Sequence, residues 1–170
     1  MKPIIFSTPM IQAILAGNKT QTRRIVQGDH KNIFWNKIVL NGHGGYTNEH
    51  GTPIKDKYNV GDIIWAREMF AKWEPSIFTP REAVQIFLEI KEAWIEELQM
   101  IDQTDAIAEG IVMNNKPHEG WYFMEGVYST DSPVVAYQKL WEKINGTGSW
   151  AQNPYVWVIS FEKVEKPFKR

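Results

Sequence analysis

The pattern of apolar and polar residues predicts several strands joined by long polar connections. Strands are expected where apolar or β-branched residues alternate or run together, at 2–6, 20–26, 63–68, 83–90 and 155–161, with a further candidate at 33–40. The segment 155–161 is apolar on both faces, so we expect it to lie inside a sheet. The segment 92–101 is ambiguous between strand and helix.

Three short helices are predicted, each with a start signal and a glycine at its end. The first follows Ser7-Thr8-Pro9 and ends at Gly17, the second runs from Asp102 to Gly110, and the third runs from Ser132-Pro133 to Gly146. The buried face of the third helix is predicted to consist of Val134, Val135, Leu140, Trp141 and Ile144. The segments 27–59, 69–81 and 111–131 are interpreted as loops or irregular structure, with a hairpin possible in the first.

These elements indicate one α+β domain. A chain of 170 residues, 43% apolar and 23% charged, is long enough for a single core and has the composition of an ordered globular protein. The pattern contains no βαβ repetition, no glycine-rich phosphate loop and no internal repeat. We therefore expect a small, mainly antiparallel barrel or curled sheet with peripheral short helices.

Composition restricts the chemistry. The chain has no cysteine, which excludes disulfides, thiolate catalysis and thiolate metal sites and is typical of a reducing compartment. No apolar run is long enough for a signal peptide or a membrane span, so we expect a cytoplasmic protein without a membrane partner. The net charge of -1 means that any nucleic-acid binding would depend on a local patch. The 8 tryptophans fit either packing or base-stacking platforms.

The histidines do not predict a metal site. Their positions show neither metal-ligand spacing nor a carboxylate in register, and surface loops are the expected location of His30, His43, His50 and His118. We expect no metal and no cofactor.

The segment Lys19–Arg24, read K-T-Q-T-R-R, is the densest group of cations and hydroxyls in the chain and is interpreted as a binding wall. On a strand, Thr20, Thr22 and Arg24 face one side, while Gln21 and Arg23 face the other. Lys19 lies in the preceding turn, so it is free to converge with Thr22 on one pocket.

Two further charged positions are candidates. Arg67 lies at the far end of a predicted strand, where it is either solvated or at the edge of the pocket. Glu109 is read as the last residue of its helix, where a carboxylate opposes the helix dipole. That position indicates a role other than helix stability, although a merely exposed glutamate fits nearly as well.

The segment G-N-K-T-Q-T-R-R at 17–24 resembles the G-x-K-T-x-T-x-R signature of the ASCH domain, a PUA-like β-barrel family. The sequences V-G-D at 60–62, D-A-I-A-E-G at 105–110 and N-P-Y-V-W-V-I at 153–159 follow in that family's order. The chain is most similar to the larger ASCH proteins of phages and prophages. Relative to the smallest members, a single domain over 1–170 would carry insertions near 27–58, 68–82 and 111–131.

This resemblance implies a cleft that binds RNA or a modified nucleoside. One bacterial branch of the family removes the acetyl group from N4-acetylcytidine with a Lys, a Thr and a Glu. By motif position these residues fall on Lys19, Thr22 and Glu109, which we expect to be catalytic. We expect the substrate-binding residues to be Thr20, Arg23, Arg24 and Arg67. The alternatives are a non-catalytic RNA-binding module, a ribonuclease that uses the same cleft, and a phage accessory protein with a vestigial site.

Overall fold

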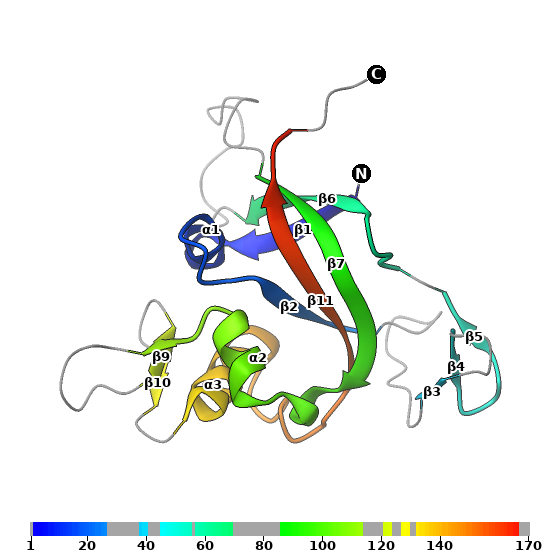
Figure 1. Cartoon of the computed structure of the whole chain (residues 1–170). Coiled ribbons are helices and arrows are strands. Elements are labelled where there is room, and N and C mark those ends of the chain that lie inside the picture. Colours follow the sequence, from blue (N-terminus) through cyan, green and yellow to red (C-terminus); the bar gives the residue numbers. More distant parts are fainter. Residues whose placement is uncertain are drawn as a thin grey trace.

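A computed structural model describes residues 2–26, 38–40, 45–55, 57–69, 86–113, 121–123, 127–129 and 132–166. Its main sheet has five strands in the order β1-β6-β7-β11-β2. They are β1 (Lys2–Ser7), β6 (Ile63–Met69), β7 (Ile86–Glu97), β11 (Tyr155–Val164) and β2 (Gln21–Ile25). β1 pairs parallel with β6, whereas the other pairs are antiparallel. The long strands β7 and β11 run side by side through the middle of the molecule (Figure 1).

Two small sheets accompany the main one. One has the order β3-β4-β5, and its strands are β3 (Ile38–Leu40), β4 (Tyr46–Asn48) and β5 (Pro53–Ile54). The other has the order β10-β9-β8, and its strands are β8 (Val112–Met113), β9 (Trp121–Phe123) and β10 (Val127–Ser129). The interpretation of 111–131 as irregular was therefore wrong at these strands, because two or three residues give too few alternating positions to produce a period of two.

The three predicted helices are confirmed as α1 (Thr8–Leu15), α2 (Gln103–Ala108) and α3 (Pro133–Asn145). Two of the expected caps form hydrogen bonds. Asp102 Oδ1 accepts from the Asp105 amide at 2.8 Å, and Ser132 Oγ accepts from the Val135 amide at 3.2 Å. Ser7 occupies the N-cap position of α1 without a side-chain cap, and Pro9 lies in the first turn.

The segment 92–97 continues β7, and only Leu98–Met100 turns into a 3-10 helix. The residues after Ile90 are mostly half-buried on both faces of the strand, so they show no clean alternation. A register shift between Ser160 and Phe161 of the partner strand also interrupts the pairing. Because of both features, the alternation of apolar and polar residues does not reveal that the strand continues through this segment.

The buried face of α3 differs in part from the prediction. Leu140 and Trp141 are buried as expected, but Ile144 is 55% exposed. The helix instead turns Ala136 and Tyr137 inward. A tyrosine faces a core at low cost when its hydroxyl has a partner, as the Tyr137 hydroxyl has here, and this shifts the buried stripe away from Ile144.

The main sheet is curled. Its two edge strands are β1 and β2, yet Arg24 Nη2 of β2 donates to the Ile5 carbonyl of β1 at 2.7 Å. The core includes residues with no exposed surface, namely Phe6, Leu88, Ile90, Val156, Val158 and Ile159. β11 lies between β7 and β2, as its two apolar faces predicted. The predicted α+β class, with a curled, mainly antiparallel sheet and short helices, is confirmed, and it is compatible with a PUA-like barrel.

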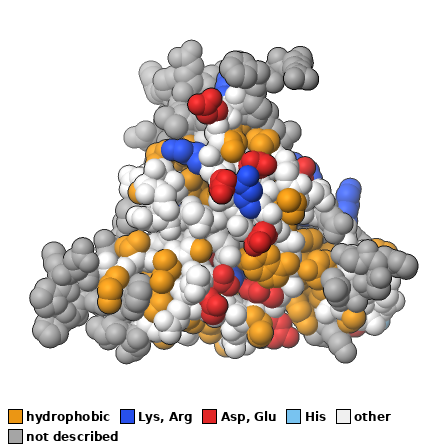
Figure 2. Space-filling view, in the orientation of Figure 1, with side chains coloured by type: hydrophobic (Ala, Val, Ile, Leu, Met, Phe, Trp, Pro, Cys, Tyr) orange, Lys and Arg blue, Asp and Glu red, His pale blue; other side chains and the backbone are white. Residues whose placement is uncertain are grey.

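Charge is distributed unevenly on the face that Figure 2 shows. Acidic side chains gather in front of α2 and the lower end of β7, next to apolar side chains. These elements carry Glu96, Asp102 and Asp105. Among the residues that the structure describes, no helix is long and apolar enough to cross a membrane.

Candidate functional site

The backbone brings Lys19 next to Glu109. Gly17 ends α1 with a φ of +77°, and the amides of Asn18 and Lys19 then both donate to the Ala13 carbonyl, at 2.9 and 3.1 Å. Thr20 donates its amide to the Ala108 carbonyl at 2.8 Å, at the end of α2. Lys19 and Glu109 thereby form an isolated antiparallel bridge, across 90 positions of sequence.

The Lys19 ammonium is fully enclosed. Its Nζ donates to Glu109 Oε2 at 2.5 Å, to the Glu109 carbonyl at 2.9 Å and to the Gln21 carbonyl at 2.9 Å, which occupies all three donors. The side chain has no exposed surface. Burial lowers the pKa of Lys19 below its usual value, although the charge of Glu109 opposes this shift. Lys19 therefore loses its proton to form the neutral amine more readily than a lysine in water does.

Each oxygen of the Glu109 carboxylate has its own partners. Oε2 accepts from Lys19, while Oε1 accepts from the Tyr137 hydroxyl at 3.3 Å and from Arg23 Nη1 at 3.5 Å. Burial raises the pKa of Tyr137 well above its usual value, and the negative charge of Glu109 adds to the shift. Tyr137 therefore stays protonated and donates at every ordinary pH. Glu109 is the C-cap of α2, which ends at Ala108, so the helix stops one residue before the predicted last residue.

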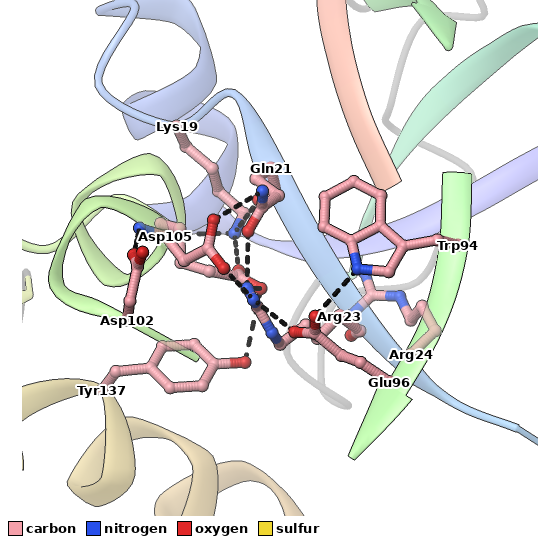
Figure 3. Close-up of polar contacts among 10 residues, drawn as sticks. Lys19, Gln21, Arg23, Arg24, Trp94, Glu96, Asp102, Asp105 and Tyr137 are labelled. Carbon is pink, nitrogen blue, oxygen red and sulfur yellow. Dashed lines mark hydrogen bonds and ion pairs between the residues drawn. The ribbon is translucent and has the colours of Figure 1, made fainter. Parts of the chain in front are cut away.

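Arg23 lies beside this pair with a fully buried side chain (Figure 3). Its Nη2 donates to Asp105 Oδ2 at 2.6 Å and to Glu96 Oε1 at 2.9 Å, and its Nη1 donates to Gln21 Oε1 at 2.5 Å. Burial alone would lower the pKa of Arg23, but Glu109 and the other acidic partners outweigh it and raise the pKa above its usual value. Arg23 thus remains a cation.

The strand parity predicted for this segment is observed. Arg23 pairs across from Val158, which pairs with Trp94, so these residues share one face of the sheet. Arg24 lies on the opposite face, where its guanidinium is 5.1 Å from the centre of the Phe6 ring. Thr22 pairs with Ile159 and is buried.

A pocket of about 80 Å³ lies between β2, α1 and α3. One wall consists of Met10 of α1, Glu109 and the β2 residues Thr22, Arg23, Arg24 and Ile25. The other wall comes from α3 with Tyr137, Leu140, Trp141, Ile144 and Asn145. Glu109 therefore faces the pocket and contacts Lys19, whereas Lys19 is not part of the wall. No hydrogen bond joins Thr22 to Lys19 or to Glu109 in the structure.

The other predicted residues lie further out. Thr20 is exposed and connects to α2 through its backbone. Arg67 is exposed on β6, opposite Ile5 of β1, and its described contacts do not join it to Lys19 or Glu109. Among the histidines, His50 is exposed beside Glu49, and the other three lie outside the described residues. The described ranges contain no group of His, Asp or Glu that could hold a metal ion.

Several site residues were not identified from the sequence. Tyr137 of α3 contacts Glu109, and Glu96 of β7 contacts Arg23. Both contacts form only when these elements pack together, so nothing in the local sequence marks either residue. Asp105 was recognised as part of a helix start, and its second role follows only from the packing of α2 on β2. The tryptophans divide between roles: Trp141 and Trp157 are core residues, whereas Trp94 is half-buried and donates to Glu96 at 2.8 Å.

Comparisons of the chain with protein-family models, with curated proteins and with solved structures found no match.

Proposed function

We propose that the protein is an ASCH-like domain that binds a modified nucleoside, or RNA that carries one, and hydrolyses its N-acyl amide. The observation that carries the proposal is the buried contact between Lys19 Nζ and the Glu109 carboxylate, which also lines the pocket bordered by Thr22. A lysine with a lowered pKa and a carboxylate that faces a pocket form a pair able to take up and return a proton.

In the proposed reaction, the Thr22 hydroxyl oxygen attacks the carbonyl carbon of the amide. The Lys19–Glu109 pair takes the hydroxyl proton and delivers it to the amide nitrogen as the C–N bond breaks. The amine leaves, and the acyl group remains as an ester on Thr22. Water then attacks this ester, the pair takes a proton from the water, and Thr22 recovers it as the free acid departs. Arg24 lines the same pocket, and we assign it to the developing oxyanion.

The surroundings favour a compact ligand over a long polyanion. The Nη atoms of Arg23 donate to Gln21 and to carboxylates of the protein itself, so we leave Arg23 out of phosphate binding. Glu96 and Asp105, the ion-pair partners of Arg23, have side chains that are 19% and 24% exposed, so they bring partly exposed carboxylates to this side of the site. Negative charge repels phosphate groups. Substrate contacts by Thr20, Arg24 and Arg67 stay predictions.

Turnover tests the proposal. Purified protein is incubated with N4-acetylcytidine and with a panel of N4-acylated cytidines, and release of cytidine is followed by chromatography. We expect release by the wild type and loss of at least about 100-fold in Lys19→Ala, because one catalytic proton-transfer group contributes about 10²–10⁴-fold. Thr22→Val should lose activity as well, whereas Thr104→Val, on the exposed side of α2, should retain it.

A folded wild-type protein that releases no cytidine from any member of the panel would refute the hydrolase. Binding of labelled RNA would then be measured against salt concentration. A non-catalytic module that contacts phosphates loses affinity steeply as salt rises, and a ribonuclease is recognised by cleaved fragments.

A further inference from the structure

Arg23 lies among Gln21, Glu96 and Asp105 (Figure 3). Through Glu109 this network reaches Lys19. Arg23 contacts acceptors on three elements: Gln21 on its own strand β2, Glu96 on β7, and Asp105 and Glu109 on α2 and its C-cap. The bonds to Asp105 and Glu96 are 2.6 and 2.9 Å long, whereas the contact to Glu109 Oε1 is 3.5 Å. Arg23 is therefore bound most closely by its outer partners, and from that fixed position its Nη1 contacts Glu109 Oε1.

The outer partners are themselves fixed. Gln21 Nε2 donates to Asp105 Oδ1 at 3.1 Å, while Gln21 Oε1 accepts from Arg23, so the amide bridges the two ionic groups. Trp94 Nε1 donates to Glu96 Oε2 at 2.8 Å and leaves Oε1 for Arg23. Each carboxylate thus presents one oxygen to Arg23 and has the other held by a neutral donor, so the guanidinium has a single well-defined position.

This arrangement has a consequence for Glu109. Its Oε1 meets Arg23 and Tyr137, which leaves Oε2 directed at Lys19 Nζ. A buried ionic network is weak evidence for stability, because the cost of removing charges from water offsets their attraction, but it does define a unique geometry. We propose that Arg23 is a positioning residue that holds the Glu109 carboxylate against Lys19, with Asp105 and Glu96 keeping Arg23 in place.

The role of Arg23 in turnover rests on the proposed hydrolysis. The tests of this inference therefore include one measurement that does not require activity. Lys19 is faced by Glu109 from the end of α2 and by Arg23 and Arg24 from β2, and Tyr137 of α3 faces Glu109. The positive charge of Arg23 opposes protonation of Lys19. NMR titration of the Lys19 side-chain amine follows this coupling directly in the intact protein.

In turnover, Arg23→Met should lower kcat about 100-fold with little change in KM, because misplacing a catalytic group by about 1 Å costs about that factor. Arg23→Lys keeps the charge without the planar fork, so it should recover part of the rate. Glu96→Gln and Trp94→Phe loosen the outer support without removing the buried cation, and they should lower kcat by a smaller factor. Glu89→Gln, on the same strand but paired with Lys91, is the matched control and should match the wild type.

In the titration, Arg23→Lys keeps the positive charge but loses the fork that holds Glu109, so Lys19 should titrate at a lower pKa than in the wild type. Arg23→Met removes the charge and the hold together, so its kcat is the informative value. If Arg23→Met does not fold, Arg23→Lys, Glu96→Gln and Trp94→Phe give the decisive kcat values. A folded Arg23→Met with unchanged kcat would overturn the inference, as would an Arg23→Lys whose Lys19 titrates as in the wild type, or wild-type kcat in the three milder variants. A wild type without turnover would refute the proposed function, and the Lys19 titration would then decide the positioning role alone.

Discussion

Replacing Glu109 with glutamine removes the negative charge opposite a fully buried lysine and keeps the shape of the side chain. The Lys19 ammonium would then face Arg23 and Arg24 without its 2.5 Å partner. Breaking one member of a buried ion pair costs about 3–5 kcal/mol, because the remaining charge is left uncompensated. We expect Glu109→Gln to lose about this amount of unfolding free energy at pH 7.

The unfolding free energy that Glu109→Gln loses should change with pH in a defined direction. Because burial lowers the pKa of Lys19 in the folded protein, the unfolded chain binds more protons between that pKa and the usual lysine pKa of 10.5. Stability therefore rises with pH across this window. Without Glu109 the pKa of Lys19 in the folded protein falls further. The pH range over which stability rises therefore extends to lower pH. The destabilisation by Glu109→Gln should therefore be larger at pH 7 than near pH 10.

Urea unfolding followed by tryptophan fluorescence at several pH values measures this effect. The control is Glu162→Gln, which removes a carboxylate that is 69% exposed and 3.3 Å from Lys91. An exposed pair of this kind contributes at most about 1 kcal/mol. A loss below about 1 kcal/mol for Glu109→Gln, or an equal loss at every pH, would refute the assignment of Lys19 and Glu109 as a coupled buried pair.

Three further predictions follow from the same geometry. Trp141→Ala should cost about 3–5 kcal/mol in urea unfolding as a core truncation, and Ile144→Ala, which is mostly exposed, should cost less than about 1 kcal/mol; equal losses would contradict the observed face of α3. Tyr137→Phe removes one donor to a carboxylate and should cost about 1.5–3 kcal/mol, which a value near zero would contradict. The rate of amide hydrolysis should rise with pH as Lys19 loses its proton and should level off below pH 10.5, since burial lowers the pKa of Lys19; a flat profile would exclude Lys19 as the base.

The sequence predicted the parts of the fold that have strong local signals. The caps Asp102 and Ser132 and the terminal glycines delimited the helices, and the two apolar faces of 155–161 placed β11 inside the sheet. Elements without a local signal were missed. The second half of β7 is half-buried, and β8, β9 and β10 contain two or three residues each.

The residues of the site likewise divide into those with a local sequence signal and those without one. The parity of β2 follows from strand geometry and correctly separated Arg23 from Arg24. The partners of Arg23 could not be predicted, because Glu96 and Asp105 are 73 and 82 positions away and meet it only after β7, β11 and β2 have paired. Glu109 had an indirect signal, since a carboxylate at a helix C-terminus opposes the helix dipole, and the structure pairs it with Lys19.

The most direct test of the central claim is release of cytidine from N4-acetylcytidine by the wild type and by Lys19→Ala, both shown to be folded by circular dichroism. The proposed Lys19–Glu109 proton transfer predicts release by the wild type and at least about a 100-fold lower rate in the variant. Equal rates in the two proteins, or no release by the folded wild type, would contradict it.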